Sequence, residues 1–184
     1  MSYVKEKAGA EVEIRPATFD DLYDVARVHV TVWQQAYVGQ VSQDYIDRLD
    51  IKARHERWKE KFQETFSSGK KLYIACEDDQ VVGFVSFGPA RDEDMAGNGE
   101  IYAIYALKDV WKKSVGYQLF KTAKQEFLAQ GTTAFYLWVL ASNHRAIDSY
   151  RRWGGEVFQE KTKDLTISGQ VLKEVMVKFD GPVG

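Results

Sequence analysis

The run TAFYLWVL at residues 133–140 restricts the fold of this chain more than any other segment. It contains no charged residue, and aromatic and branched side chains of this kind are common in strands. A strand that is apolar along its whole length has to be covered on both faces, which places it in the middle of a sheet. The fold is therefore expected to be built around this strand.

The remaining segments alternate between strand-like and helix-like patterns. Strands are expected at 11–17, 71–77, 81–88, 100–107, 133–140, 157–163 and 170–179, and helices at 18–37, 43–49, 52–69, 118–131 and 143–155. Neither a repeat nor a linker interrupts this order. It predicts one mixed α+β domain over residues 11–180, preceded by a flexible leader at residues 1–10.

Composition argues against several classes of function. The chain has 184 residues, a net charge of −2 and a pI near 6.0, a balance that does not favour binding to nucleic acid or to an anionic membrane. Cys76 is the single cysteine, so no internal disulfide can form, and the three histidines are scattered without the spacing of a metal site. With no apolar run of about 18 residues and no signal peptide, we expect a cytoplasmic protein.

The segment KDVWKKSVGYQLF at residues 108–120 lies between an expected strand and an expected helix. The first turn of a helix has unpaired backbone N–H groups and a partial positive charge, so it can bind an anion where small residues let the backbone approach. Gly116 and Ser114 are small, and Lys112 and Lys113 add charge. The junction alone fits a phosphate-binding turn and an ordinary turn with surface lysines equally well, and neither the Walker A nor the dinucleotide-binding pattern is present.

A second segment, NHRAIDSYRRWGG at residues 143–155, favours the phosphate-binding alternative. Asn143, Ala146 and Tyr150 are spaced to share one face of a helix that follows the buried strand. The small side chain at 146 leaves room for a ligand, and the phenol of Tyr150 is a candidate proton donor.

Together these two segments resemble the GNAT (GCN5-related) N-acetyltransferases. That family has an acetyl-CoA loop of the form Q/R-x-x-G-x-G/A and a later segment N-x-x-A-x-x-x-Y-x-x-x-G-F. Asn143, Ala146, Tyr150 and Gly154 match the later segment, and WKKSVG at 111–116 occupies the loop. The order of elements is also similar over about residues 12–180. The resemblance implies a GNAT fold, with a central, mixed but mostly antiparallel sheet of about seven strands flanked by four to five helices.

The loop departs from the family pattern at several positions. Trp111 stands at the Q/R position and Ser114 at the first glycine, so that only Gly116 remains of the loop glycines, and Gly155 replaces the final aromatic residue of the later segment. Since a serine is disfavoured where the backbone needs a positive φ, these changes predict altered or weaker binding of acetyl-CoA.

In this family an amine attacks the thioester of acetyl-CoA directly in a ternary complex, without a metal. By resemblance, Glu100 is the candidate base, acting through a water, and Tyr150 is the candidate acid for the departing thiolate. The backbone of Ile104 and Ala106 is expected to bind the pantetheine arm, with a backbone N–H near Ala106 as the oxyanion donor. Asn143 is expected to bind the arm, to cap its helix, or to do both. The other cofactor-binding candidates are the junction residues Lys112, Lys113, Ser114, Val115, Gly116 and Tyr117.

The acceptor is expected to be a primary amine of a small molecule or a peptide. Trp33 and Tyr37, four residues apart on the first long helix, are the candidate walls of its pocket, although both residues suit a core equally well. Two alternatives stay open, a catalytically weak module of the same fold that binds CoA or senses a ligand, and an acetyltransferase of protein N-termini. The apolar closing strands are compatible with a homodimer.

Overall fold

The structure is a computed structural model that describes residues 11–181, except for the side chains of residues 64–67. The leader expected at residues 1–10 lies outside this range. The strands are β1 (Glu13–Pro16), β2 (Lys71–Glu77), β3 (Gln80–Pro89), β4 (Gly99–Ala106), β5 (Ala134–Leu140), β6 (Glu156–Ile167) and β7 (Gln170–Asp180). The helices are α1 (Leu22–Ala36), α2 (Gln43–Asp47), α3 (Ile51–Ser68), α4 (Val115–Ala129) and α5 (His144–Arg152), with short 3-10 turns η1 (Phe19–Asp21), η2 (Glu93–Met95) and η3 (Lys108–Lys113).

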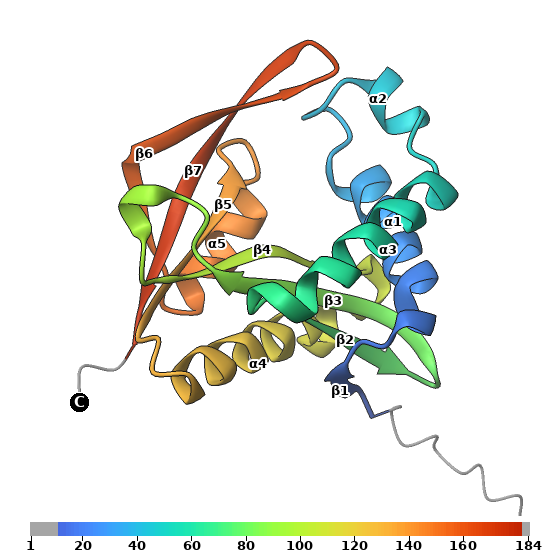
Figure 1. Cartoon of the computed structure of the whole chain (residues 1–184). Helices are drawn as coiled ribbons and strands as arrows, with labels where there is room; N and C mark the ends of the chain where they lie inside the picture. Colours follow the sequence, from blue (N-terminus) through green and yellow to red (C-terminus); the bar gives the residue numbers. More distant parts are fainter. Residues whose placement is uncertain (1–10, 182–184) are drawn as a thin grey trace, which may run out of the picture.

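All the strands belong to a 7-stranded sheet in the order β1-β2-β3-β4-β5-β7-β6 (Figure 1). Every neighbouring pair is antiparallel except β4 and β5, which run parallel. The expected mixed and mostly antiparallel sheet is therefore confirmed. The strand with the apolar run, β5, lies between β4 and β7, and it is buried on both faces, since the side chains of Phe135, Tyr136 and Leu137 are all nearly inaccessible.

Helices cover the two faces of the sheet. On one face α4 packs through Leu119, Ala123 and Phe127 against strand residues that include Val85 and Ile101. On the other face α1 and α3 bury a second cluster with the alternate strand residues, as expected for a side-chain period of two along a strand. Each apolar face is thus matched by one helical layer, and the sheet between them is the framework that positions the site.

Tight turns connect the hairpins at the two ends of the sheet. Asp78 and Asp79, between β2 and β3, both have positive φ angles, of 47° and 62°. Ser168 and Gly169, between β6 and β7, have φ angles of 48° and 79°. Two-residue turns of this kind match the twist of antiparallel strands. Both hairpins were expected, but β6 is longer than the predicted 157–163, because after an irregularity between Phe158 and Thr162 it pairs with β7 up to the turn.

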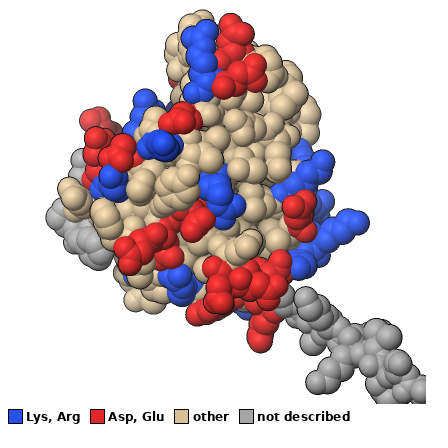
Figure 2. Space-filling model, turned by 90° about the vertical axis from the view of Figure 1, so that its right-hand side faces the viewer, with Lys and Arg blue, Asp and Glu red and all other residues tan. Residues whose placement is uncertain are grey.

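Charged side chains of both signs are interspersed on the side of the molecule that carries α1 and α3 (Figure 2). Within residues 11–181, no helix is long and apolar enough to cross a membrane.

Candidate active site

The parallel strands β4 and β5 separate as they run toward their carboxyl ends. Their pairing is limited to three positions, the last joining Ile101 to Leu137. Beyond it, β4 stays paired with β3 up to Ala106, while β5 stays paired with β7 up to Leu140. Between Ser86 and Phe87 the register with β3 shifts, leaving Tyr102 as an extra residue on β4. The end of β4 therefore has one backbone edge without a partner strand, and ligands of sheet proteins commonly bind in such an opening.

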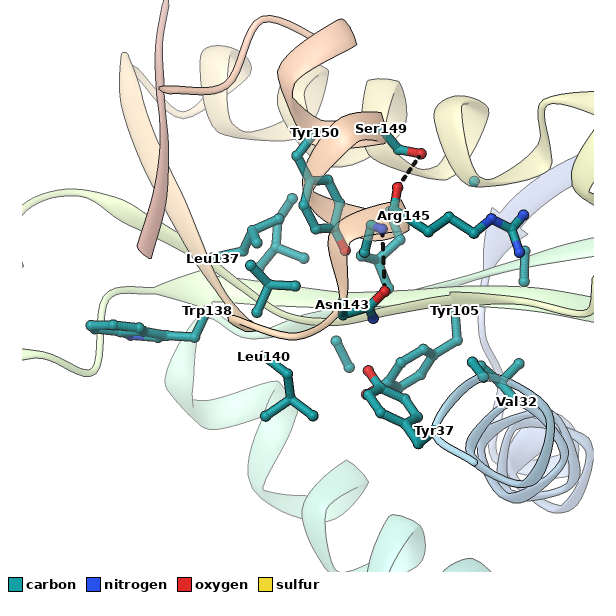
Figure 3. Close-up of a pocket in the computed structure, with 18 of the residues that line it drawn as sticks. Val32, Tyr37, Tyr105, Leu137, Trp138, Leu140, Asn143, Arg145, Ser149 and Tyr150 are labelled. Atoms are coloured by element: carbon teal, nitrogen blue, oxygen red, sulfur yellow. Dashed lines mark hydrogen bonds between the residues drawn. The ribbon is translucent and has the colours of Figure 1, made fainter. Parts of the chain in front are cut away.

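A cavity of about 930 Å³ occupies this opening and extends over both faces of the sheet (Figure 3). Its walls come from the end of α1, the second half of β4, the η3–α4 junction, the end of β5, and α5, with single residues from β6 and β7. Nine of the predicted site residues line it: Trp33, Tyr37, Ile104, Ala106, Ser114, Gly116, Tyr117, Asn143 and Tyr150. Residues that the sequence spreads over more than a hundred positions are thus brought to one site.

The start of α4 forms one end of the cavity. Ser114 is its N-cap, with φ of 59° and ψ of 24°, and its side chain forms no capping hydrogen bond. Among the described residues, no backbone acceptor faces the N–H groups of Val115, Gly116 and Tyr117. Val115, also predicted to bind the cofactor, is fully buried and is not among the residues that line the cavity. Gly116 lies next to the Trp153 ring, because a Cβ at this position would be 3.5 Å from it. The missing side chain leaves space beside that ring.

The cationic groups at this end differ from those predicted. Lys112 and Lys113 do not line the cavity, and Lys113 is held by an ion pair with Glu77 at the end of β2. The lining instead contains Lys108, Arg145 and Arg152. These three have no carboxylate partner in the part of the chain that the structure describes.

Arg145 is placed by a stacking contact. Its guanidinium lies over the ring of Trp111, whose indole N–H donates a hydrogen bond of 2.8 Å to the carbonyl oxygen of Ala106. Burial lowers the pKa of Arg145, and the charge of Arg152 adds to this effect. Two neighbouring cations without acidic partners favour an anionic ligand, because its charge would offset both burial and repulsion.

Asn143 and Tyr150 lie on the face of α5 that lines the cavity, as their spacing predicted. Asn143 is the N-cap of α5, and its side-chain oxygen accepts a hydrogen bond of 3.2 Å from the N–H of Ala146. Tyr150 is buried in α5 with its hydroxyl directed into the cavity (Figure 3), and no hydrogen bond to that hydroxyl is present within residues 11–181. Burial raises the pKa of Tyr150, and the nearby Tyr105 adds to the effect, so the phenol keeps its proton at neutral pH.

The opposite end of the cavity is aromatic. Trp33 and Tyr37 stack with ring centroids 4.5 Å apart, and the indole N–H of Trp33 donates a hydrogen bond of 3.2 Å to the hydroxyl of Tyr105. Tyr37 and Tyr105 both point toward the cavity from α1 and β4 (Figure 3). Burial raises the pKa of both tyrosines, which are therefore neutral hydrogen-bonding groups.

Residues 33–155 match the family model described as Acetyltransferase (GNAT) family. The chain belongs to the GNAT acetyltransferase family. Along 165 residues, it is 32% identical to an uncharacterized N-acetyltransferase, YuaI, of Bacillus subtilis, which covers 89% of this chain and 90% of the relative. As the sequence predicted, this GNAT protein is an N-acetyltransferase.

Solved structures show the same fold. The PaiA N-acetyltransferase from Thermoplasma acidophilum, in complex with coenzyme A, superposes with a TM-score of 0.75 at 20% identity and covers 92% of this chain and 99% of that one. YncA from Salmonella typhimurium, a putative acetyltransferase with acetyl-CoA, gives a TM-score of 0.69 at 17% identity, covering 94% and 95% of the two chains. At these identities the likeness concerns the fold.

One departure of this GNAT chain from the family pattern has a steric reason. At Gly155, where an aromatic residue is usual, a Cβ would lie 2.6 Å from a methyl of Val177 and 2.7 Å from the ring of Phe179. Phe179 on β7 stacks on Phe135 of β5 and packs against Phe120 of α4. The space for the usual aromatic side chain is thus filled from another strand.

Glu100 lies in a different environment from the one expected for a base. Only 1% of it is exposed, and it does not line the cavity of the GNAT fold. Its carboxylate accepts hydrogen bonds from the backbone and side chain of Arg91, the shortest being 2.5 Å from Nη2, and one of 3.2 Å from the Tyr136 hydroxyl. A carboxylate held in this way is an acceptor for fixed donors and does not border the cavity.

Sequence reasoning did not select several residues that line the cavity, among them Tyr102, Tyr105, Lys108, Trp138 and Glu174. Tyr102 and Tyr105 belong to a strand whose aromatic residues indicate packing in the core. Glu174 belongs to the last strand, in which charged and apolar residues are mixed. Apart from Lys108 of η3, these residues lie on β4, β5 and β7 around the opening between β4 and β5, and that proximity follows only from the strand order. Among the described residues, no group of three His, Cys, Asp or Glu side chains could hold a metal ion.

Proposed function

We propose that this protein transfers the acetyl group of acetyl-CoA to a primary amine of a small molecule or peptide, by direct attack in a ternary complex. One observation carries the proposal. The opening between β4 and β5 connects an anion-binding end, at α4 and α5, with an aromatic end, at α1, in one cavity. Such a cavity can hold a long, phosphate-bearing donor and an acceptor at the same time.

The donor is proposed to lie along the open edge of β4. Its pyrophosphate would bind the free N–H groups of Val115, Gly116 and Tyr117 at the start of α4. Lys108, Arg145 and Arg152 would supply the positive charge there. The pantetheine arm would then run beside Ile104 and Ala106 as an added strand, since this edge lacks a partner strand beyond Ile101.

The proposed reaction has a simple balance. The amine nitrogen bonds to the acetyl carbonyl carbon, the C–S bond of the thioester breaks, and its electron pair leaves on the CoA sulfur. An ammonium acceptor loses two protons and keeps one on the amide nitrogen. One net proton is released, because the sulfur takes up one proton. A neutral phenol beside the sulfur would lower the barrier to thiolate departure by donating that proton.

Tyr150 is the residue proposed to donate the proton. It is buried in α5, and its hydroxyl points into the cavity without a hydrogen-bond partner among the described residues. Asn143, which caps the same helix and lines the cavity, would border the proposed path of the pantetheine arm. We propose a structural role for Glu100 in place of the base expected from the sequence, because Arg91 and Tyr136 occupy its carboxylate.

Calorimetric titration with acetyl-CoA tests the proposed donor site. We expect micromolar binding that weakens with acetyl-CoA lacking the 3′-phosphate. Arg145→Gln should weaken binding about tenfold, the typical effect of losing one charge-assisted contact. The matched control is Arg151→Gln on the same helix, because Arg151 is outside the cavity lining and pairs with Asp148 at 3.6 Å. Absence of binding at millimolar acetyl-CoA would rule out the proposed donor.

A further inference from the structure

Charge is distributed unevenly along the cavity. The basic lining residues Lys108, Arg145 and Arg152 all belong to η3 or to α5. Of the acidic residues in the described part of the chain, Glu174 alone lines the cavity, and it comes from β7. The cavity is therefore positively charged where the phosphates of a donor would bind, and negatively charged beside β7, where Glu174 lies.

Glu174 is held in a fixed position by the sheet. Within β7 it lies opposite Leu140 of β5 on one side and Lys163 of β6 on the other. Leu140 packs with Tyr37 in an apolar cluster, so the same strand position borders the aromatic end of the cavity. The side chain of Glu174 is 14% exposed.

The charge of Glu174 is only partly compensated. The Nζ of Lys163 is 3.8 Å from Glu174 Oε2, which is beyond hydrogen-bond distance, and 4.3 Å from the centroid of the Trp138 ring. Lys163 thus divides its contacts between a carboxylate and a ring. Burial raises the pKa of Glu174, with Lys163 acting in the opposite direction. A ligand that brings a hydrogen-bonding cation would satisfy this carboxylate better than Lys163 does.

Aromatic side chains line the same cavity as Glu174. Trp33 and Tyr37 come from the end of α1, Tyr105 comes from β4, and Trp138 comes from β5. The raised pKa of Tyr105 comes chiefly from burial, with a contribution from the charge of Glu174. Aromatic faces bind both apolar bodies and cations.

We infer that Glu174 binds the ammonium of the acceptor, and that the acceptor is a primary amine with an aromatic or apolar body and no carboxylate beside the amine. The inference rests on the proposed acetyl transfer and names its acceptor class. An α-amino acid is disfavoured, because its carboxylate would lie against Glu174 in a half-buried site where like charges repel strongly.

Two probes that differ by one carboxylate test this inference, 2-phenylethylamine and phenylalanine. Each is titrated calorimetrically into the complex of the protein with CoA, and CoA release from acetyl-CoA is measured with each as acceptor. We expect 2-phenylethylamine to bind and phenylalanine to bind at least tenfold more weakly. Glu174→Gln should raise the Kd and KM for 2-phenylethylamine about tenfold and narrow the difference between the probes, without changing the Kd for acetyl-CoA.

The matched control is Asp164→Asn on β6, because Asp164 pairs with Lys173 at 3.4 Å and does not line the cavity. It should leave both probes unaffected. If the CoA complex fails to bind 2-phenylethylamine at 10 mM, or if Glu174→Gln binds it as the natural protein does, the inference is overturned. If the unaltered protein does not bind acetyl-CoA, the proposed function is overturned instead. The two failures are therefore distinguishable.

Discussion

At the scale of single residues, the conformation of Ser114 is the clearest departure from what its side chain favours. It has the left-handed backbone that glycine adopts without cost, with φ of 59°. This conformation costs a residue with a Cβ roughly 1–2 kcal/mol. The serine therefore occupies a glycine position of the family loop while keeping the backbone shape that the glycine would give.

Replacing Ser114 with glycine should therefore stabilise the protein. The strain energy removed exceeds the entropic cost that arises because glycine is more flexible in the unfolded chain. We therefore expect a gain of about 0.5–1 kcal/mol in the free energy of unfolding. For a chain of this size, that gain corresponds to a rise in Tm of about 1–4 °C. Denaturant and thermal unfolding of Ser114→Gly measure the effect, and acetyl-CoA affinity should hold or increase.

Ser149→Gly is the matched control for this substitution. Ser149 lies within α5 and donates a hydrogen bond of 3.1 Å to the carbonyl oxygen of Arg145. Glycine in a helix interior lowers stability by about 0.5–1 kcal/mol. Destabilisation by Ser114→Gly, or a large loss of acetyl-CoA affinity, would show that the serine side chain has a role of its own.

At the scale of elements, the segment between β3 and β4 is fixed by a polar network around Glu100. Arg91 bonds the Glu100 carboxylate, and the one hydroxyl proton of Tyr136 is shared between Asp92, at 2.7 Å, and Glu100, at 3.2 Å. Asp92 also accepts a hydrogen bond of 2.8 Å from Trp138. An ion pair between Asp94 and Lys161 extends the network to β6, beside which the segment lies in Figure 1. The network thus fixes the indole of Trp138, a residue of the cavity lining.

Glu100→Gln should lower stability more than activity. It removes the buried charge to which Arg91 is bonded, and we expect a loss of about 1–3 kcal/mol in the free energy of unfolding. The loss should not be larger, because Arg91 is half exposed and water can solvate its charge once the partner is removed. With both substrates saturating, kcat should stay within about threefold of the natural protein. Unfolding curves and CoA release measure the two quantities. A fall in kcat of a hundredfold at unchanged stability would return Glu100 to the role of base.

At the scale of the whole molecule, sequence reasoning predicted the fold well because its signals are local. The apolar run of β5 and the turn residues Asp78 and Asp79 each specify structure within a few positions of themselves. The helix face that joins Asn143 to Tyr150 is local in the same sense, and it correctly placed both residues in the cavity.

The parts of the site that sequence reasoning missed depend on contacts between distant segments. Glu100 forms an ion pair with Arg91 of the β3–β4 loop, and Lys113 forms an ion pair with Glu77 of β2. The side chains of Glu100 and Lys113, both predicted to belong to the site, are therefore engaged away from the cavity. Glu174 borders the cavity because β7 inserts between β5 and β6. A single sequence carries no local signal for strand order, and strand order decides which charges face a cavity.

Turnover by Tyr150→Phe is the measurement that most directly tests acetyl transfer in this cavity. The release of CoA from acetyl-CoA is followed with 2-phenylethylamine as acceptor, alongside the Kd for acetyl-CoA. Since a proton donor acts only when the thiolate leaves, we expect kcat to fall about a hundredfold while the Kd changes less than about threefold. Unchanged turnover would contradict the assignment of the proton donor and, with it, the account of how this cavity performs the chemistry.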